Sequence, residues 1–90
     1  MRKVIRSLGG RFYKWVSPGN DGVPDRIIAV PPNGRIVFVE MKTPEGELSE
    51  IQKEQARRLR ACGCDVRCAY GWDQAEALIK ELFPHYKQGR

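Results

Sequence analysis

A hairpin signal in the first half of the chain constrains the fold more than any other feature. The dipeptide Asn33-Gly34 stands between two runs rich in β-branched and apolar residues, residues 25–30 and 35–42. Asparagine and glycine both tolerate the positive φ that tight hairpin turns require, and the flanking runs have the composition of strands. The sequence therefore predicts that these two runs pair as an antiparallel hairpin.

The register of this hairpin decides which polar side chains share a face of the sheet. A two-residue loop places Asp25 opposite Lys42 and diagonal to Glu40, whereas a loop that closes Val30 on Arg35 places Asp25 directly opposite Glu40. Opposed residues share a face, and side chains alternate along a strand. Both registers therefore put the three polar residues on one face. A three-residue loop would separate them, and we discount that register.

The two carboxylates would then carry like charges at one end of a small sheet. Cross-strand neighbours have Cβ atoms about 5 to 8 Å apart, a distance at which two carboxylates repel each other. A divalent cation with oxygen ligands removes that repulsion. Spacing alone fits two interpretations equally well. One is a metal site for phosphodiester chemistry, and the other is a solvent-facing pair of Glu40 and Lys42 with Asp25 as a turn residue.

The rest of the chain has the pattern of one domain over residues 1–90, without linkers, repeats or low-complexity segments. Alternation of apolar and polar residues predicts four strands, at residues 11–16, 25–30, 35–42 and 65–70. Apolar periodicity and caps predict three helices, at residues 2–8, from the capping box of Ser49 and Gln52 to residue 62, and from a cap at Asp73 to Phe83. This order predicts an α/β fold with a mixed four-stranded sheet flanked by helices, whose last parallel strand is reached by a crossover helix.

Three motifs occur in order along the chain. They are Gly-Val-Pro-Asp at residues 22–25, Phe-Val-Glu-Met-Lys at residues 38–42 and Gly-x-Leu-Ser-x-x-Gln at residues 46–52. Together they resemble the virus-type replication-repair nuclease domain (VRR-NUC) of the PD-(D/E)xK nuclease superfamily, in its stand-alone, phage-like form. The resemblance runs from about residue 9 to residue 77. It implies a restriction-endonuclease-like αβββαβ core and a metal-dependent deoxyribonuclease that leaves a 5′-phosphate.

Carried over by position, the resemblance implies a role for each motif residue. Asp25 and Glu40 would hold Mg²⁺ or Mn²⁺ together with the backbone carbonyl of Met41. Lys42 would orient or deprotonate the attacking water. Gln52 would support the site from the following helix.

Gln52 has two competing explanations. The capping box with Ser49 already accounts for a glutamine at this position, because its side chain satisfies a free backbone N–H at the start of the helix. Gln55, one turn later, is an alternative support for the site. The family resemblance favours Gln52.

The chain departs from the family pattern in its first helix, which usually carries an acidic residue near the metal. Here residues 1–8 contain three basic residues and no acid, and the first acid in the chain is Asp21. Either the metal has fewer protein ligands, or Asp21 or a water molecule takes the missing place.

Positive charge is concentrated near the start of the chain, which has a net charge of +5. Lysine and arginine side chains neutralise DNA phosphates, so an uneven basic charge fits a DNA-binding surface. Taken alone, such charge indicates no more than a solvated surface. The residues expected to contact DNA are Arg2, Lys3, Arg6, Arg11 and Lys14, with Lys53 from the crossover helix.

The cysteines indicate the compartment. Cys62, Cys64 and Cys68 are odd in number, and their spacing does not match a zinc site. We interpret them as reduced thiols of a cytoplasmic protein, in a bacterial or phage-infected cell. The sequence contains no apolar run long enough to span a membrane and no apolar region typical of a signal peptide.

The aromatic and branched residues suggest a partner surface. A thin core does not need all of this apolar surface, and large exposed apolar patches mark interfaces. We therefore expect a homodimer, with a monomer that binds another protein as the alternative. Two further interpretations of function stay open: a catalytically weak nucleic-acid-binding module and a replisome interaction protein. The apolar residues in question are Tyr13, Trp15, Val37, Val39 and Trp72.

Overall fold

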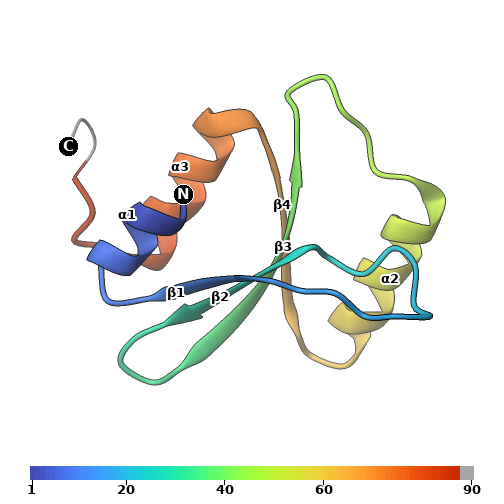
Figure 1. Cartoon of the computed structure of the whole chain (residues 1–90), viewed down its shortest axis with the longest axis horizontal. Helices are drawn as coiled ribbons and strands as arrows, with labels where there is room; N and C mark the ends of the chain where they lie inside the picture. Colours follow the sequence, from blue (N-terminus) through green and yellow to red (C-terminus); the bar gives the residue numbers. More distant parts are fainter. Residues whose placement is uncertain (88–90) are drawn as a thin grey trace.

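The computed structural model describes residues 1–87 and arranges their helices and strands in the order αβββαβα (Figure 1). The four strands form one sheet in the order β1-β2-β3-β4, in which β1, β2 and β3 are antiparallel and β4 runs parallel to β3. The predicted mixed α/β sheet is confirmed. The bounds are α1 Arg2–Ser7, β1 Arg11–Lys14, β2 Arg26–Val30, β3 Arg35–Lys42, α2 Glu50–Ala61, β4 Asp65–Tyr70 and α3 Gly71–Leu82.

The β2–β3 hairpin adopts the wider of the two registers considered. Val30 pairs with Arg35. Gly34 closes the loop with a φ of 72°, and its N–H donates to the Val30 carbonyl at 3.1 Å. Glycine adopts this φ without the steric cost that other residues meet. Continued past the end of β2, the register sets Asp25 opposite Glu40.

Helices cover both faces of the sheet (Figure 1). Helices α1 and α3 lie on one face, and α2 lies on the other. Side chains alternate along β3, so Val37 and Val39 point into the core with α1 and α3, while Phe38 and Glu40 point toward α2. Both valines are fully buried, and the expectation that they contribute surplus apolar surface is wrong. The largest fully buried side chains are Ile5, Ile28, Val37, Val39 and Ile79.

Helix α3 begins earlier than the sequence predicts. Its N-cap is Tyr70 and its first residue is Gly71, whose φ of 80° turns the chain directly out of β4. Asp73 therefore lies in the first turn of α3, and the predicted cap at Asp73 is wrong. The Tyr70 N–H is satisfied by the Gln74 side chain at 3.0 Å. None of the helices described over residues 1–87 has the length and apolar character needed to cross a membrane.

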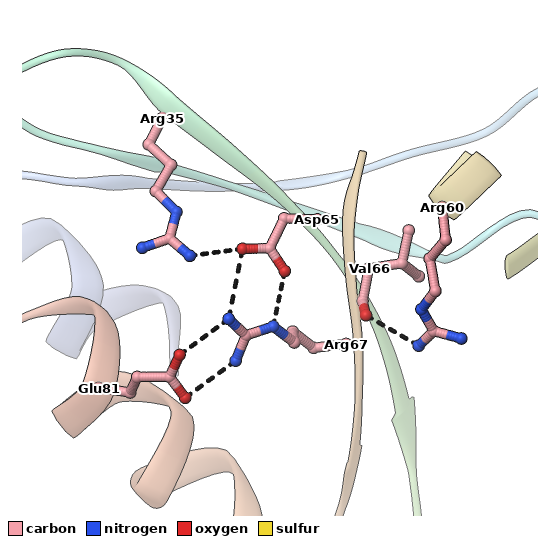
Figure 2. A network of polar contacts seen from close by, with 6 residues as sticks. All are labelled: Arg35, Arg60, Asp65, Val66, Arg67 and Glu81. Carbon is pink, nitrogen blue, oxygen red and sulfur yellow. Dashed lines mark hydrogen bonds and ion pairs between the residues drawn. The ribbon is translucent and has the colours of Figure 1, made fainter. Parts of the chain in front are cut away.

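A network of ion pairs joins β3, β4 and α3 (Figure 2). Asp65 accepts hydrogen bonds from Arg35 at 2.5 Å and from Arg67 at 2.6 Å, and Arg67 makes a two-pronged contact with Glu81. Burial raises the pKa of Asp65, but the hydrogen bonds from Arg67 and Arg35 outweigh it, so the pKa lies below its ordinary value of 3.8. The ionised form of Asp65 therefore stabilises the fold.

The same view shows how α2 is attached to β4. Arg60, in the last turn of α2, donates to the Val66 carbonyl at 2.8 Å (Figure 2). Strand β4 is an edge strand, and this bond satisfies one of its backbone groups. The crossover helix is thus fixed to the strand that follows it.

The first prediction concerns the dependence of stability on pH. Because the pKa of Asp65 is lower in the folded chain than in the unfolded chain, its contribution is present at neutral pH and is lost as pH falls through the folded pKa. Asp65→Asn should lower Tm by a few degrees at pH 7, and this difference should shrink below about pH 4. Thermal unfolding followed by circular dichroism from pH 7 to pH 2.5 measures it.

The control is Glu45→Gln, which removes an exposed loop carboxylate outside the network. It should unfold like the wild type at every pH. A Tm difference for Asp65→Asn that is unchanged between pH 7 and pH 3 would contradict the prediction.

Candidate active site

Asp25 directly precedes β2 and is held by contacts to the chain segments on both sides of it. Its carbonyl accepts the N–H of Trp15 at 2.9 Å, and its Oδ1 accepts the N–H of Met41 at 3.2 Å. Its Oδ2 lies 3.3 Å from the Arg26 guanidinium. Arg26 is not among the residues that the sequence predicts for the site, although its position directly after Asp25 was a readable signal.

Glu40 is the one buried charged residue in the part of the chain that the structure describes, at 8% exposure. Its Oε2 accepts a hydrogen bond from Gln52 at 3.3 Å and lies 4.0 Å from the Lys42 ammonium. Burial and the nearby Asp25 raise the pKa of Glu40, while Lys42 and Arg26 act in the opposite direction. The nearby positive charges therefore do not fully offset the cost of keeping Glu40 ionised.

The hairpin register brings Asp25, Glu40 and Lys42 to one end of the sheet, on the face covered by α2. The Lys42 side chain is 24% exposed and its ammonium reaches the same carboxylate oxygen that Gln52 contacts. This cluster contains two acids, one ammonium and one amide, with the amide and the ammonium both directed at Glu40. It is the arrangement that the three sequence motifs predict.

Gln52 performs both of the roles that seemed to compete. Its Oε1 accepts the Ser49 N–H at 2.9 Å, and its own N–H donates to the Ser49 hydroxyl at 3.2 Å, which completes the capping box. Its Nε2 donates to Glu40. A carboxamide has one acceptor oxygen and two donor hydrogens, so one side chain serves both partners. Gln55 instead donates to the Asp21 carbonyl at 3.0 Å and does not replace Gln52.

The loop before Asp25 packs directly on the start of α2. Gly22 has a φ of 84°, and a Cβ at this position would lie 2.8 Å from the backbone of Ile51. Only glycine allows so close an approach at this φ. Pro24, two residues later, is buried. These contacts give a physical reason for Gly-Val-Pro in front of the aspartate.

The site offers few protein ligands for a metal ion. No group of three or more His, Cys, Asp and Glu residues that could hold a metal occurs within residues 1–87, so Asp21 does not join Asp25 and Glu40. The donors present still suit a hard cation, because both are carboxylates and because Mg²⁺ keeps several waters when one or two carboxylates bind it. The observation that supports this fit is the burial of Glu40 opposite Asp25, which leaves two carboxylates together at one end of the sheet.

Strand β4 adds two residues that the sequence does not predict for the site. In the β3–β4 register Cys68 pairs with Glu40 and Tyr70 with Lys42. The pKa of Tyr70 is raised mainly by a hydrogen bond with Cys68 and, to a smaller extent, by desolvation. No local signal reports the register of a parallel pair joined by a long crossover. Cys62, Cys64 and Cys68 are free thiols.

The basic residues expected to contact DNA are distributed over two helices and one strand. Lys53 on α2 forms an ion pair with Glu50 at 3.2 Å and lies apart from the basic group near the start of the chain. All members of that group are exposed. They are Arg2, Lys3 and Arg6 on α1, and Arg11 and Lys14 on β1.

Comparison with known proteins agrees with this geometry. The family model of the VRR-NUC domain matches residues 2–73. "Putative nuclease p44" of Acyrthosiphon pisum secondary endosymbiont phage 1 is 48% identical over 62 residues, which are 69% of this chain and 66% of that protein. The chain therefore spans about two thirds of the length of this phage relative.

Solved structures show the same fold. A structure described as "VRR_NUC domain" superposes with a TM-score of 0.78 at 29% identity, covering 96% of this chain and 88% of that one. A second, "VRR_NUC domain protein", gives a TM-score of 0.66 at 20% identity over 81% of this chain and 67% of that chain. With the motif residues gathered at one end of the sheet and a family match over most of its length, the chain belongs to the VRR-NUC family of nuclease domains.

Proposed function

We propose that this nuclease domain is a metal-dependent DNA endonuclease that hydrolyses phosphodiester bonds and selects branched or junction DNA, leaving a 5′-phosphate. One observation carries the proposal. The buried Glu40 carboxylate, whose pKa is raised, lies beside Asp25 and 4.0 Å from the Lys42 ammonium. A buried carboxylate beside a second acid and a lysine, at the end of a sheet, suits the hydrolysis of a phosphodiester.

Asp25 and Glu40 would hold Mg²⁺ or Mn²⁺, with the Met41 carbonyl as a third donor. The Met41 N–H points to Asp25, and the N–H and C=O of one residue point to the same side of a strand. This direction supports the carbonyl as a ligand. When bound, such a cation polarises the scissile phosphate and lowers the pKa of a coordinated water.

The remaining side chains hold the reacting groups in place. Gln52 fixes the Glu40 carboxylate through its amide, and Arg26 and the Met41 N–H fix Asp25. The Lys42 ammonium orients the attacking water, assists its deprotonation and offsets negative charge that develops on the phosphate. Lys42 acts on the water and the phosphate rather than on the ion.

A second candidate function rests on the first helix. Residues 2–7 of α1 carry three basic residues and no acid, which favours a catalytically weak nucleic-acid-binding module without one of the metal ligands. Such a module would bind DNA and fail to cut it with either metal. A replisome interaction protein would bind no DNA at low salt.

We also propose a cytoplasmic homodimer. The support for the dimer is exposed apolar surface, which marks interfaces when it is contiguous. Val37 and Val39 do not contribute to it, since both are buried. Light scattering in moderate salt tests the dimer, and a mass equal to one 10.3 kDa chain would exclude it. The exposed large apolar side chains in the described part are Tyr13, Val16, Ile36, Ile51 and Trp72.

Substitution of the lysine should separate catalysis from binding. Lys42→Ala should reduce cleavage by at least about 100-fold, the range expected when an acid–base group is removed, and leave Mn²⁺ and DNA binding nearly unchanged. Asp25→Asn and Glu40→Gln should lose Mn²⁺ binding. The measurements are cleavage of labelled branched and linear DNAs with Mg²⁺, Mn²⁺ or EDTA, and calorimetric titration with Mn²⁺.

The matched control for this series is Arg58→Ala, which removes an exposed basic side chain paired with Glu54. It should cut like the wild type. Wild-type cleavage by any one of the three site variants would refute the proposed roles.

Removal of the buried charge should stabilise the metal-free fold. Glu40→Gln should raise Tm by a few degrees, because it removes both the desolvation of a buried carboxylate and its repulsion from Asp25. Asp25→Asn should raise Tm less, because Asp25 also loses its ion pair with Arg26. Millimolar Mn²⁺ should raise the Tm of the wild type but of neither variant, since only a ligand of the native state stabilises it. An equal Mn²⁺ response in all three proteins would show that the carboxylates do not form the site.

A further inference from the structure

Three arginines surround a hollow beside the first strand. The hollow has a volume of about 190 Å³ and is lined by Arg2, Arg6, Arg11, Phe12 and Tyr13. The three arginines are exposed, and the Tyr13 side chain is 56% exposed. The cluster lies at the free edge of β1, the end strand of the sheet.

The three guanidinium groups have no carboxylate partner among the residues that the structure describes. Within residues 1–87, no ion pair involves Arg2, Arg6 or Arg11, and the single hydrogen bond from Arg11 goes to the carbonyl of Gly10. Basic residues of α2 differ, because each of Lys53, Arg57 and Arg58 is paired with an acid of the same helix. The charge of the arginine cluster is therefore available to an outside anion.

Local structure holds the cluster together. Arg2 and Arg6 are four residues apart in α1, so their side chains lie on one face of the helix. Gly10 then turns the chain into β1 and packs so tightly that a Cβ would lie 2.7 Å from the Phe83 ring. This turn brings Arg11 beside α1. Like charges gathered at a fixed position repel each other, and an anion removes that repulsion.

The cluster is connected to the candidate active site through β1. Arg11, Tyr13 and Trp15 alternate onto one face of the sheet, and the Trp15 N–H bonds to the carbonyl of Asp25. Asp25 and Glu40 lie on that same face. Helix α1, which carries Arg2 and Arg6, covers the opposite face of the sheet, so the hollow lies at the β1 edge between the two faces.

We infer that this hollow is a phosphate subsite that holds the DNA backbone at the β1 edge, away from the bond to be cut. Arginine is suited to it, because a guanidinium donates two parallel hydrogen bonds to a phosphodiester. The subsite fixes the register of the DNA across the β1 edge and carries no base recognition. This inference rests on the proposed function, since it takes DNA as the substrate.

Binding without metal tests the subsite independently of cleavage. The triple variant Arg2→Gln, Arg6→Gln, Arg11→Gln is compared with the wild type by fluorescence anisotropy on a labelled duplex in EDTA. We expect the affinity to fall by about tenfold or more at low salt. The slope of log K against log salt should become shallower by about 0.9 for each phosphate that the variant no longer neutralises.

A charge-matched control separates the subsite from net charge. The variant Arg57→Gln, Arg58→Gln, Lys80→Gln removes the same charge from α2 and α3, at exposed residues outside the set expected to contact DNA. It should keep the affinity within about twofold. An equal decrease in both triple variants would show a net-charge effect and overturn the subsite. Thermal unfolding establishes that each variant is folded, and a version with Arg2, Arg6 and Arg11 changed to lysine should keep the salt slope.

Neutral phosphates locate the subsite along the DNA. A methylphosphonate is moved one step at a time along each strand, and one or two positions should weaken binding by the wild type. The same positions should have no effect on the glutamine triple variant, because the arginines that bind those phosphates are already absent. Wild-type affinity of the triple variant, or an undiminished methylphosphonate effect in it, would overturn the inference. A wild type that binds DNA in this way but never cuts it would refute the proposed function and leave the subsite intact.

Discussion

The arrangement of side chains at this end of the sheet depends on the burial of the Glu40 carboxylate. A charged residue at 8% exposure is costly unless other groups compensate it. Gln52 supplies one hydrogen bond and Lys42 stands 4.0 Å away, while Asp25 adds a second negative charge beside it. The balance leaves the pKa of Glu40 raised. An apolar residue at this buried position would therefore make the fold more stable than Glu40 does. Natural proteins often accept such a loss of stability at functional sites.

One amide ties the position of α2 to that carboxylate. The Gln52 oxygen closes the capping box with Ser49, and its nitrogen reaches Glu40. Helix start and site geometry are therefore fixed by the same side chain. Gly22, packed on the backbone of Ile51, adds a second point at which the loop before Asp25 and α2 must fit together. A shift of α2 would disturb both acids at once.

Most of the fold could be predicted from local sequence patterns, and the remaining features depend on long-range strand register. The hairpin was predictable because a four-residue or a two-residue loop gives the same parity, so Asp25, Glu40 and Lys42 share a face in either register. The positions of Cys68 and Tyr70 beside Glu40 and Lys42 could not be predicted, because the register of β4 depends on how the whole crossover packs. Helix α3 starts early because Gly71 adopts a positive φ. The sequence gives no sign of this φ, and Asp73 resembles a helix cap, so the predicted start was too late.

The distribution of acids, rather than the net charge of +5, decides where a polyanion can bind. On α2 every lysine and arginine up to Arg58 has an acid three or four residues away, and these pairs neutralise the helix surface. Helix α1 has no acid within its six residues. The same absence removes the acid that the family resemblance leads us to expect near a metal, and it leaves Arg2 and Arg6 without an acid on their own helix. The smaller set of metal ligands and the phosphate subsite that we propose would therefore both follow from one feature of the sequence.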